Sequence, residues 1–479
     1  MRTCRDLGMG AVAVYSDVDR DALHVRLADE AFPLGAASPQ ESYLSIEKLI
    51  AIARRSGCDA VHPGYGFLSE NADFAEAVAA GGLAFIGPPG KVQRLLGEKT
   101  RARRLAKDAG VPIAEGTNQP LRDATEARGI AARVGYPVML KAAGGGGGKG
   151  MRIVRSADEL DASWRVATGE ASAAFGTPAL FLERLIEGAR HVEMQLIADE
   201  HGNVVWLGER DCSIQRRHQK LIEESPGPSV DDALRAKLGN AAVRIARTAG
   251  YVNAGTAEFL VSPSGEFFFL EVNTRLQVEH PVTELVTGLD LVALQFRAAS
   301  GEKLPFTQDS VRCVGSAIEL RVTAEDARAG FVPSSGRIAL LRLPAGPGVR
   351  VDHALFDGMA VPTEYDPLLA KIVVWGKHRA EALARAKRAV RETIVAGLAT
   401  SLPFHAYALA DRDFAAGTYD TGFVAAHWPP ADEPELDEDE LMAGALGAVL
   451  ARRASAARIA SDGDGLSPFT RAAREDALR

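Results

Sequence analysis

The chain has 479 residues, a formal net charge of −8 and four cysteines, Cys4, Cys58, Cys212 and Cys313. This length exceeds what one hydrophobic core holds, so about three packed units are expected, and an acidic balance without a basic run argues against a nucleic acid partner. The cysteine spacing fits no metal site, and the sequence shows neither a signal peptide nor an apolar run of about eighteen residues, which predicts free thiols and a cytoplasmic protein with no membrane partner.

Residues 1–97 alternate short hydrophobic runs with helical patterns. We expect strands near 12–15, 60–62 and 84–87, and a helix over 43–56, with a further helix over 379–396 in the C-terminal part. Strands that alternate with helices are typical of a parallel sheet. The N-terminal region therefore predicts an α/β fold.

Five consecutive glycines, 144–148, follow a predicted strand that ends at Lys141, and a second strand is expected at 151–154. Consecutive glycines let backbone N–H groups approach an anion, and the flanking lysines add positive charge. The order of strand, loop and strand differs from a Walker A loop and from G-x-G-x-x-G, because both of these open a helix. A flexible linker is the alternative, but the two hydrophobic strands favour a phosphate-binding loop.

Two further strands, 255–261 and 266–273, are expected to form an antiparallel hairpin around the turn 262–265. If Ser262 faces Phe267, the two glutamates of the hairpin face each other on one surface of the sheet. The turn composition, Ser-Pro-Ser-Gly, supports this pairing.

In that register Glu258 faces Glu271, and like charges at this separation are destabilising unless a positive group lies between them. Asn273 adds a neutral oxygen on the same face. Carboxylate and amide oxygens suit Mg²⁺ or Mn²⁺. The pair therefore predicts a metal site, with solvated edge residues as the alternative.

Polar groups alternate with hydrophobic ones along 271–279, except at Thr274. In an extended chain this period of two places the polar side chains on one face. The preceding segment 267–270 is too apolar for an exposed strand, so the polar row is expected to line an interior site. Its members are Glu271, Asn273, Arg275, Gln277 and Glu279.

The glycine loop, the paired carboxylates and the run NTRLQVEHP at 273–281 together resemble an ATP-grasp enzyme, and specifically the biotin carboxylase of acetyl- and propionyl-CoA carboxylases. The resemblance covers residue 1 to about 427 and includes ordered motifs on both sides of the hairpin. These motifs are HPGYGFLSEN at 62–71, RHVE at 190–193, ERDCS at 209–213, QRRHQK at 215–220 and ELRVTAED at 319–326.

The resemblance implies an α/β ATP-grasp fold with a Rossmann-like N-terminal domain, a glycine-rich lid and a C-terminal biotin carboxylase domain. The family opens with a strand and a glycine turn that this sequence lacks, and losing a central strand costs on the order of several kcal/mol. Either the true start lies upstream or the chain is a weakened or inactive relative. The predicted domains are 1–97, Rossmann-like and truncated at its start; 98–300, ATP-grasp, with the lid over about 113–185; 301–427, C-terminal; and 428–479, an acidic linker and helical tail.

The resemblance also assigns site residues. ATP would contact Lys99 and Lys141 with its phosphates, Gly147 and Gly148 in the lid, Glu183, Arg184, Leu185 and Ile186 along the adenine, His191 at the ribose and His218 in the pocket. The Mg²⁺ or Mn²⁺ ions would bind Glu258, Glu271 and Asn273. Bicarbonate would lie among Lys220, Arg275, Gln277, Val278 and Arg321, with Glu279 as the base that deprotonates it.

In this family ATP phosphorylates bicarbonate to carboxyphosphate, and the ureido nitrogen of biotin then takes up the carboxyl group. Phosphoryl transfer needs positioning and charge neutralisation more than a protein nucleophile. Arg275 suits planar carbonate through its bidentate fork. Glu279 beside Arg275 and Lys220 is expected to stay ionised, as a base must, and Arg321 would stabilise the biotin enolate.

No Met-Lys-Met acceptor site for biotin occurs in the sequence. Biotin is therefore expected as a substrate on a separate carrier chain, with the carboxyltransferase on another polypeptide, and the resemblance implies a homodimer. An acidic linker at 429–440 precedes an alanine-rich helical stretch at 441–460. That stretch is either a docking helix for the carrier or a remnant, with equal weight for each.

Other functions stay open. A different ATP-grasp ligase, acting on ammonia or an amine, would hydrolyse ATP without biotin dependence, although the motif at 275–281 and Arg321 count against it. A truncated assembly partner without activity would gain no heat stability from ATP and Mg²⁺. Pyruvate carboxylase is an alternative to the acyl-CoA enzymes.

Overall fold

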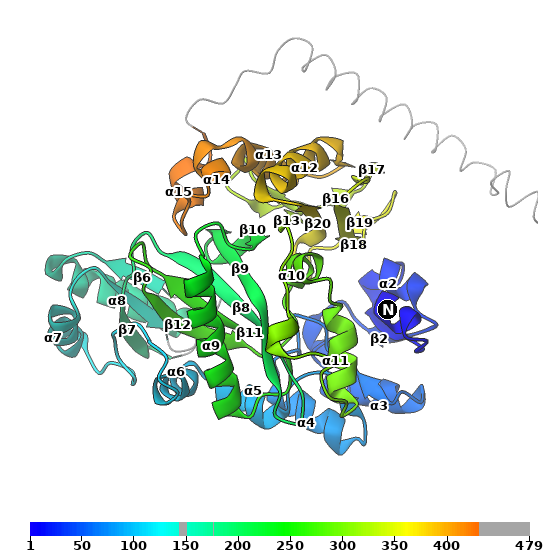
Figure 1. Ribbon diagram of the computed structural model, residues 1–479, viewed down its shortest axis with the longest axis horizontal. Helices are drawn as coiled ribbons and strands as arrows, with labels where there is room; N and C mark the ends of the chain where they lie inside the picture. The colour runs from blue at the N-terminus through cyan, green and yellow to red at the C-terminus, as the bar shows by residue number, and fades with distance from the viewer. Residues whose placement is uncertain (143–150, 176, 431–479) are drawn as a thin grey trace, which may run out of the picture. The chain divides into compact units, whose positions relative to one another are not determined.

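The largest sheet of the computed structural model has eight strands, each antiparallel to its neighbours, in the order β12-β11-β8-β9-β10-β13-β20-β18 (Figure 1). Nearly every residue of β8 is buried, so the polar side chains of this central strand must find partners inside the protein. The eight strands are β8 (Arg190–Ala198), β9 (Val204–Arg216), β10 (Gln219–Ser225), β11 (Asn253–Val261), β12 (Phe267–Asn273), β13 (Ser316–Thr323), β18 (Val349–His353) and β20 (Leu368–Gly376).

The structure describes residues 1–142, 151–175 and 177–430. By internal contacts the chain divides into Met1–His427 and Trp428–Arg479. The alanine-rich stretch predicted at 441–460, and the predicted lid residues Gly147 and Gly148, lie outside the described residues.

Helix α9 (Asp232–Ala249) packs on β8 and β9. It begins where the Asp231 side chain accepts a hydrogen bond from the Leu234 N–H, and it ends at Gly250, whose φ of 64° suits a residue without Cβ. Its buried face of leucine, alanine and isoleucine joins a core that includes Phe259 and Phe269 of the hairpin. This core fixes the strands that carry the site.

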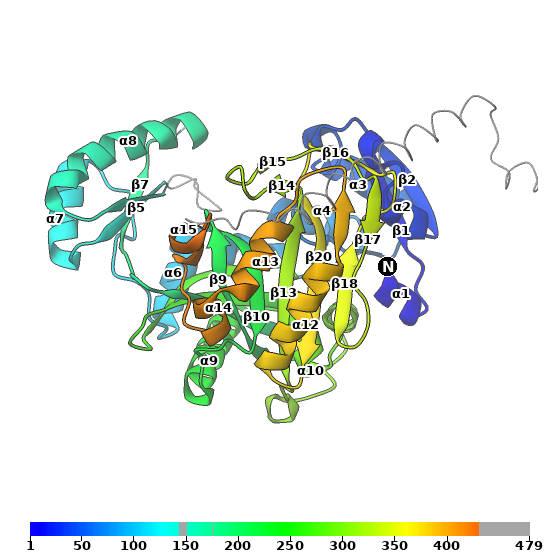
Figure 2. The ribbon, with the colours of Figure 1, turned by 90° about the horizontal axis from the view of Figure 1, so that it is seen from above.

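Other helices surround the eight-stranded sheet. On the C-terminal half α12 packs against β13 and β20, as Figure 2 shows, while α10 contacts β9, β10, β13 and β20. The helices of this half are α10 (His280–Thr287), α11 (Leu291–Ala299), α12 (Arg379–Glu392), α13 (Leu402–Ala410), α14 (Arg412–Ala416) and α15 (Phe423–His427).

The N-terminal region alternates strands and helices, as predicted. Its strands pair in parallel, but in two separate sheets, β1 with β2 and β3 with β4. The elements are α1 (Arg2–Asp6), β1 (Val12–Ser16), α2 (Leu23–Leu27), β2 (Glu30–Gly35), α3 (Ile46–Arg55), β3 (Ala60–Val61), α4 (Ala72–Ala80), β4 (Ala84–Phe85), α5 (Gly90–Gly97) and α6 (Lys99–Asp108).

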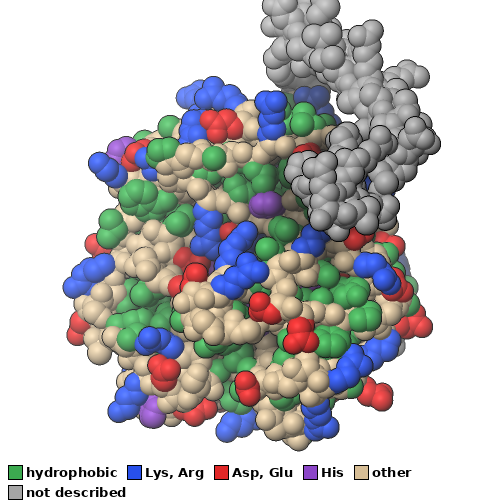
Figure 3. All heavy atoms as spheres, turned by 90° about the vertical axis from the view of Figure 1, so that its right-hand side faces the viewer, with side chains coloured by type: hydrophobic (Ala, Val, Ile, Leu, Met, Phe, Trp, Pro, Cys, Tyr) green, Lys and Arg blue, Asp and Glu red, His purple; other side chains and the backbone are tan. Residues whose placement is uncertain are grey.

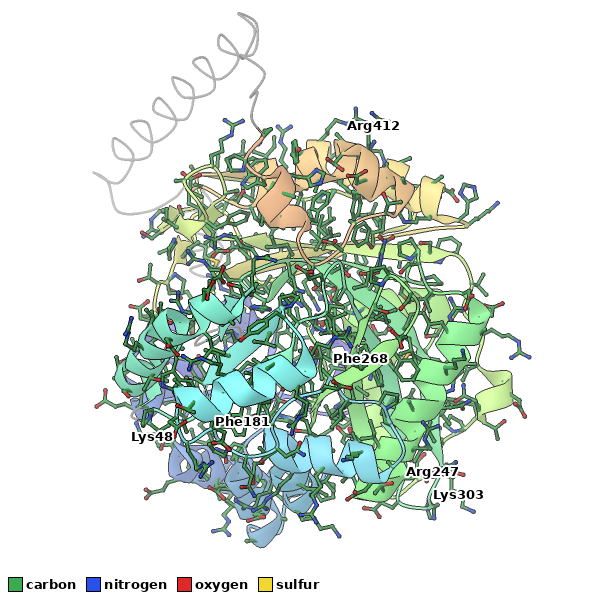
Figure 4. The ribbon with its side chains drawn as sticks, turned by 90° about the vertical axis from the view of Figure 1, so that its left-hand side faces the viewer. Lys48, Phe181, Arg247, Phe268, Lys303 and Arg412 are labelled. Carbon is green, nitrogen blue, oxygen red and sulfur yellow. The ribbon has the colours of Figure 1, made fainter. Side chains whose placement is uncertain are left out.

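A three-stranded sheet of order β6-β5-β7 carries the ends of the glycine loop. Strands β5 and β6 are antiparallel neighbours, which confirms the predicted order of strand, loop and strand. Phe181 of β7 and Phe268 of β12 are half-buried and are labelled in Figure 4. The elements are α7 (Ala124–Val134), β5 (Val138–Ala142), β6 (Met151–Val154), α8 (Ala157–Phe175) and β7 (Leu180–Arg184).

One predicted helix, over 379–396, is too long. Helix α12 ends at Glu392, because Thr393, Ile394 and Val395 are β-branched and favour an extended chain. Residues Ile394–Ala396 instead form β21, which pairs with β17. The remaining short strands are β14 (Glu325–Asp326), β15 (Val332–Pro333), β16 (Gly336–Arg337), β17 (Leu340–Arg342) and β19 (Ala360–Val361).

Among the described residues, no helix combines the length and apolar character needed to cross a membrane. On the face shown in Figure 3, acidic, basic and hydrophobic side chains are interspersed.

Candidate active site

The hairpin of β11 and β12 brings the predicted metal-binding carboxylates together. Glu258 pairs directly with Glu271, as predicted. Near the turn the predicted register is wrong, because Val261 rather than Ser262 faces Phe267. A β-bulge next to Glu258 takes up one residue of β12 and restores the pairing of the two glutamates.

A row of charged side chains crosses four neighbouring strands. Glu258 on β11 faces Glu271 on β12 and Glu193 on β8, and Glu193 faces Arg210 on β9. Side chains directly opposite in an antiparallel sheet have Cβ atoms about 5 Å apart. Arg210 is fully buried and donates Nε to Glu193 at 2.5 Å, so a cation inside the protein anchors one end of the row.

Lys220, on β10, joins three carboxylates. Its Nζ donates to Glu193 at 2.6 Å, to Glu258 at 2.9 Å and to Glu279 at 2.7 Å. These bonds use every N–H of the ammonium group. Burial alone would lower the pKa of Lys220, but the three carboxylates raise it well above its usual value. Lys220 is therefore a fixed cation.

Glu279 lies between two cations immediately before helix α10. The side chain is fully buried and accepts hydrogen bonds from Lys220 at 2.7 Å and from Arg321 Nη2 at 2.8 Å. Burial alone would raise the pKa of Glu279, but Lys220, Arg321 and Arg210 hold it well below the usual range. The carboxylate is thus ionised, although its second partner is Arg321 rather than the expected Arg275.

Arg321, on β13, is held from several sides. Its Nε donates to Glu223 on β10 at 2.5 Å, while Nη2 binds Glu279. Its backbone carbonyl accepts from Ser401 Oγ at 2.9 Å and lies 2.7 Å from His405 Nε2. The guanidinium group therefore has a defined orientation toward Glu279.

The predicted extended row is wrong beyond Asn273, where β12 ends. The Thr274 N–H donates to Glu70 at 3.0 Å, and Pro281 lies in the first turn of α10, where proline is favoured. The chain therefore turns after Asn273 and enters a helix, and Glu279 reaches the site from the helix start.

Arg275 pairs with a carboxylate of the N-terminal region. Its Nε donates to Glu70 at 2.9 Å, and Nη1 donates to Gln277 Oε1 at 3.2 Å. Within the described part of the chain, the buried Gln277 Nε2 has no hydrogen-bond partner. The carbonyl of Val278 accepts from Lys371 at 2.7 Å. Arg275 and Gln277 thus offer donors beside each other to a small anion.

Lys99 and Lys141, the predicted contacts of the ATP phosphates, are less buried than Lys220 and Glu279. Lys99, at the start of α6, lies 3.9 Å from Glu271, and Lys141 on β5 forms an ion pair with Glu183. His218 lies in the turn between β9 and β10 with φ 65°. Loss of solvent lowers the pKa of His218, and Lys141, His191 and Lys99 lower it further, so these groups share one electrostatic neighbourhood.

The predicted adenine hinge is tied to other segments. Glu183 accepts from Arg103 at 2.8 Å, in addition to its ion pair with Lys141. The N–H groups of Arg184 and Leu185 donate to the carbonyls of residues 115 and 137 at 2.7 and 3.0 Å, and Ile186 follows the end of β7. These bonds fix the segment in space.

His191, predicted at the ribose, is buried against Glu258, with 2.9 Å between Nε2 and Oε2. Burial alone would lower the pKa of His191, but Glu258 raises it above its usual value. The ring thus stabilises the ionised form of a predicted metal ligand.

The acidic pair fits a divalent cation. Partial loss of solvent raises the pKa of Glu271, and the facing Glu258 raises it further, so a positive charge between them would relieve the repulsion. Asn273 Nδ2 donates to Glu258 at 2.7 Å. An Asn273 oxygen ligand would require rotation of this amide, while the two carboxylates are oxygen ligands as they stand.

Four residues at the site had no predicted role: Glu193, Arg210, Glu70 and Glu223. The first two belong to motifs RHVE and ERDCS, and alternation along β8 and β9 places them on the face of the site. Glu70 belongs to the motif at 62–71 and reaches the site through Arg275 and the Thr274 N–H, and Glu223 reaches it through Arg321, all more than 90 residues away in the chain. The signal available in the sequence was charge at strand positions surrounded by hydrophobic residues.

Three family models match the chain. "Biotin carboxylase, N-terminal domain" matches residues 1–92, "Carbamoyl-phosphate synthase L chain, ATP binding domain" matches 98–307, and "Biotin carboxylase C-terminal domain" matches 319–426.

Curated relatives are similar over most of their length. A biotin carboxylase of a Nostoc species is 50% identical over 424 residues, covering 88% of this chain and 95% of the relative. One of the pyruvate carboxylase subunits of Methanothermobacter thermautotrophicus is 48% identical, covering 88% and 86%. The biotin-dependent acyl-coenzyme A carboxylase alpha3 subunit of Mycobacterium leprae is 47% identical, covering 92% and 74%.

Among solved structures, the chain is similar to the biotin carboxylase domain dimer of Hydrogenobacter thermophilus 2-oxoglutarate carboxylase, in complex with MgADP, ADP and bicarbonate. The TM-score is 0.87 at 43% identity, and the match covers 91% of this chain and 96% of that chain.

Proposed function

Because this chain belongs to the biotin carboxylase family and is an ATP-grasp ligase that carboxylates biotin in an ATP-dependent reaction, we propose that it uses bicarbonate, through carboxyphosphate, to serve an acyl-CoA carboxylase. The observation that carries this proposal is Glu279, buried and ionised between Lys220 and Arg321. An ionised carboxylate at the meeting point of two cations can accept a proton from an anionic substrate without facing it unshielded.

Bicarbonate binds beside Arg275 and Gln277 in this proposal. The fork of Arg275 and the unpartnered Gln277 Nε2 supply donors to its oxygens, and Glu279 removes its proton. Lys220 and Arg321 offset the added negative charge. The reaction thus needs positioned charge and no covalent attachment to the chain.

ATP binds on the side of Lys99 and Lys141, with its phosphates directed toward the hairpin. Glu258 and Glu271, with Asn273, would hold Mg²⁺ or Mn²⁺, which supplies charge neutralisation for phosphoryl transfer when bound. The solved relative that contains MgADP and bicarbonate supports the same ligands for this chain. Lys141 forms an ion pair with Glu183, so phosphates that bind Lys141 would compete with that ion pair.

After bicarbonate is activated, biotin on a separate carrier chain accepts the carboxyl group. Arg321 would stabilise the enolate form of its ureido group through the guanidinium N–H groups that Glu223 does not accept. The carrier and a carboxyltransferase are the proposed partners, with a second copy of the chain in a homodimer like the relative's domain dimer.

We propose that the carboxyl group is finally transferred to an acyl-CoA, so that the chain serves an acyl-CoA carboxylase. The acyl-coenzyme A carboxylase relative matches 445 residues of this chain. The pyruvate carboxylase relative matches at a similar identity and makes a 2-oxo acid the second candidate.

The first test is ADP release by the purified chain with ATP, Mg²⁺ and bicarbonate, with and without free biotin. Biotin should stimulate turnover, and Glu279→Gln and Arg275→Ala should each abolish the stimulation. Biotin-independent turnover that needs ammonia would instead support another ATP-grasp ligase. Reconstitution with acetyl-CoA, propionyl-CoA or pyruvate carboxyltransferases then distinguishes the destinations by which acceptor becomes carboxylated.

A further inference from the structure

Two buried glutamates lie directly opposite each other behind Arg321. Glu223 on β10 and Glu319 on β13 are register partners in the eight-stranded sheet. Neither side chain is exposed to solvent. Facing positions of an antiparallel pair have Cβ atoms about 5 Å apart, so the two carboxyl groups share one small space.

The hydrogen bonds of this pair are incomplete if both groups are ionised. Glu223 Oε1 accepts from Arg321 Nε at 2.5 Å. Glu223 Oε2 and both oxygens of Glu319 have no partner among the residues that the structure describes. Buried polar atoms are nearly always hydrogen-bonded, and three adjacent acceptors without a donor contradict that rule. One proton on the pair converts one of these acceptors into a donor, so that two of the three oxygens gain a partner.

The charges around the pair favour the same state. The charges of Arg321, Glu279 and Lys220 act on Glu223, while those of Lys371, Glu223, Arg321 and Glu279 act on Glu319. Two of the cations are committed elsewhere: Lys220 to three other carboxylates, and Lys371 to the Val278 carbonyl and Asp352. The nearby His405 and Cys212 add no charge, because burial lowers the pKa of His405 to about 4 and raises that of Cys212.

Burial raises the pKa of both groups. It brings the pKa of Glu223 to about 7, against the opposing effect of Arg321. The pKa of Glu319 lies well above its usual value, because burial raises it and Glu223 adds to the effect. Glu319 is therefore the member that keeps the proton.

We propose that Glu319 is a neutral carboxylic acid that donates its O–H to Glu223, so that Glu223 presents one negative charge to Arg321 and positions the guanidinium group for the substrate. Glu223 and Glu319 are positioning residues, since they act through Arg321. The proton state stands on the geometry of the pair, whereas its effect on turnover rests on the function proposed for Arg321.

Loss of the proton would have a defined consequence. At alkaline pH the pair would carry two negative charges beside one arginine. The stronger attraction would hold the Arg321 guanidinium against Glu223 and Glu319 and weaken its interaction with a biotin enolate. Biotin-dependent turnover would then fall while ATP binding persisted.

The proton itself is tested by infrared spectroscopy of the full chain, because a protonated carboxyl group has a C=O stretch that a carboxylate lacks. The wild type should show this band at neutral pH, and Glu319→Gln should remove it. The matched control is Glu209→Gln, since buried Glu209 already accepts from Arg235 and the Gly227 N–H. A wild type without the band, or a band that survives in Glu319→Gln, would overturn the proposal even in an inactive preparation.

The positioning role is tested by Glu319→Gln against Glu319→Leu. Glutamine keeps a neutral donor, so biotin-dependent kcat should stay within about twofold, and its decline at alkaline pH should disappear. Leucine leaves Glu223 Oε2 without a donor, so kcat should fall on the order of tenfold. Equal activities of the two variants, high or low, would contradict the role. A variant that ATP and Mg²⁺ do not stabilise against heat has failed to fold.

Discussion

The two halves of the active site differ in how their charges are satisfied. In the half assigned to bicarbonate and biotin, the side chains of Lys220, Glu279 and Arg321 are 9, 0 and 16% exposed and each bonds to another charged group. In the half assigned to the nucleotide, Lys99 and Glu271 are 54 and 40% exposed and lie 3.9 Å apart.

The two halves of the active site are therefore arranged for ligand binding in different ways. The buried half is arranged before substrate arrives, and removing one of its charges leaves another without a partner in a low-dielectric environment. In the exposed half Lys99 and Glu271 stay partly solvated, so phosphates and a metal ion can approach them with little cost in broken bonds. Substitutions should therefore affect folding in one half and ligand binding in the other.

The largest expected effect comes from a matched pair of lysine substitutions. Lys220→Met leaves Glu193, Glu258 and Glu279 facing one another and should reduce the free energy of unfolding by about 3–5 kcal/mol. Lys99→Met should change it by less than about 1 kcal/mol while weakening ATP binding. Urea unfolding measures the first quantity and nucleotide titration the second. Equal losses of stability would remove the distinction between the halves.

The next prediction concerns the stability gap, which is the difference in the free energy of unfolding between wild type and Lys220→Met, and its dependence on pH. The pKa values of Glu258 and Glu279 are held below the usual range despite burial, with Lys220 contributing to both. Such groups contribute stability that is fully present above the unfolded pKa of about 4.3 and lost as pH falls through the folded values. The gap between wild type and Lys220→Met should therefore shrink on acidification, by up to about 1.4 kcal/mol per pH unit for each group.

Urea unfolding of both proteins between neutral and acid pH measures this change. A gap that widens toward acid would show that Lys220 does not depress these pKa values.

These contacts also show what the sequence can predict. The pairing of Glu258 with Glu271 was predictable, because a short hairpin relates positions that lie close in the chain. The partnership of Glu279 with Arg321 was not, because it joins a helix start to a strand 42 residues later. Motif resemblance named both residues, but their contact depends on how distant strands pair.

The error beyond Asn273 has a local cause. Alternation predicted an extended chain through Glu279, yet the Thr274 N–H is taken by Glu70, some 204 residues away in sequence. Pro281 then favours a helix start. A periodic pattern cannot reveal a hydrogen bond from another region of the chain. Glu279 still lies at the site, but at the start of a helix and not along a strand.

In the exposed half, Glu271→Gln should weaken the binding of the metal ion while leaving the fold intact. It removes one of two facing carboxylates, and the Mg²⁺ concentration for half-maximal ATP-dependent turnover should rise about tenfold. Glu266→Gln is the control, because Glu266 lies at the exposed turn of the same hairpin. An unchanged Mg²⁺ requirement in Glu271→Gln would exclude Glu271 as a ligand.

The smallest expected effect lies where the two halves meet the N-terminal region. Glu70 accepts from Arg275 Nε at 2.9 Å and from the Thr274 N–H at 3.0 Å, and the two side chains of the ion pair are 40 and 19% exposed. Glu70→Gln keeps an oxygen acceptor but removes the charge that orients Arg275. Because a partly exposed ion pair contributes about 1 kcal/mol or less, the KM for bicarbonate should rise by about threefold, with kcat nearly constant.

Glu76→Gln is the matched control for Glu70→Gln, because Glu76 is a half-exposed glutamate that pairs with a different arginine, Arg94. Its KM for bicarbonate should be that of the wild type. A fall in kcat of Glu70→Gln without a rise in KM would mean that Glu70 acts after bicarbonate is bound. The arginine would then belong with the buried half, whose charges are fixed before substrate arrives.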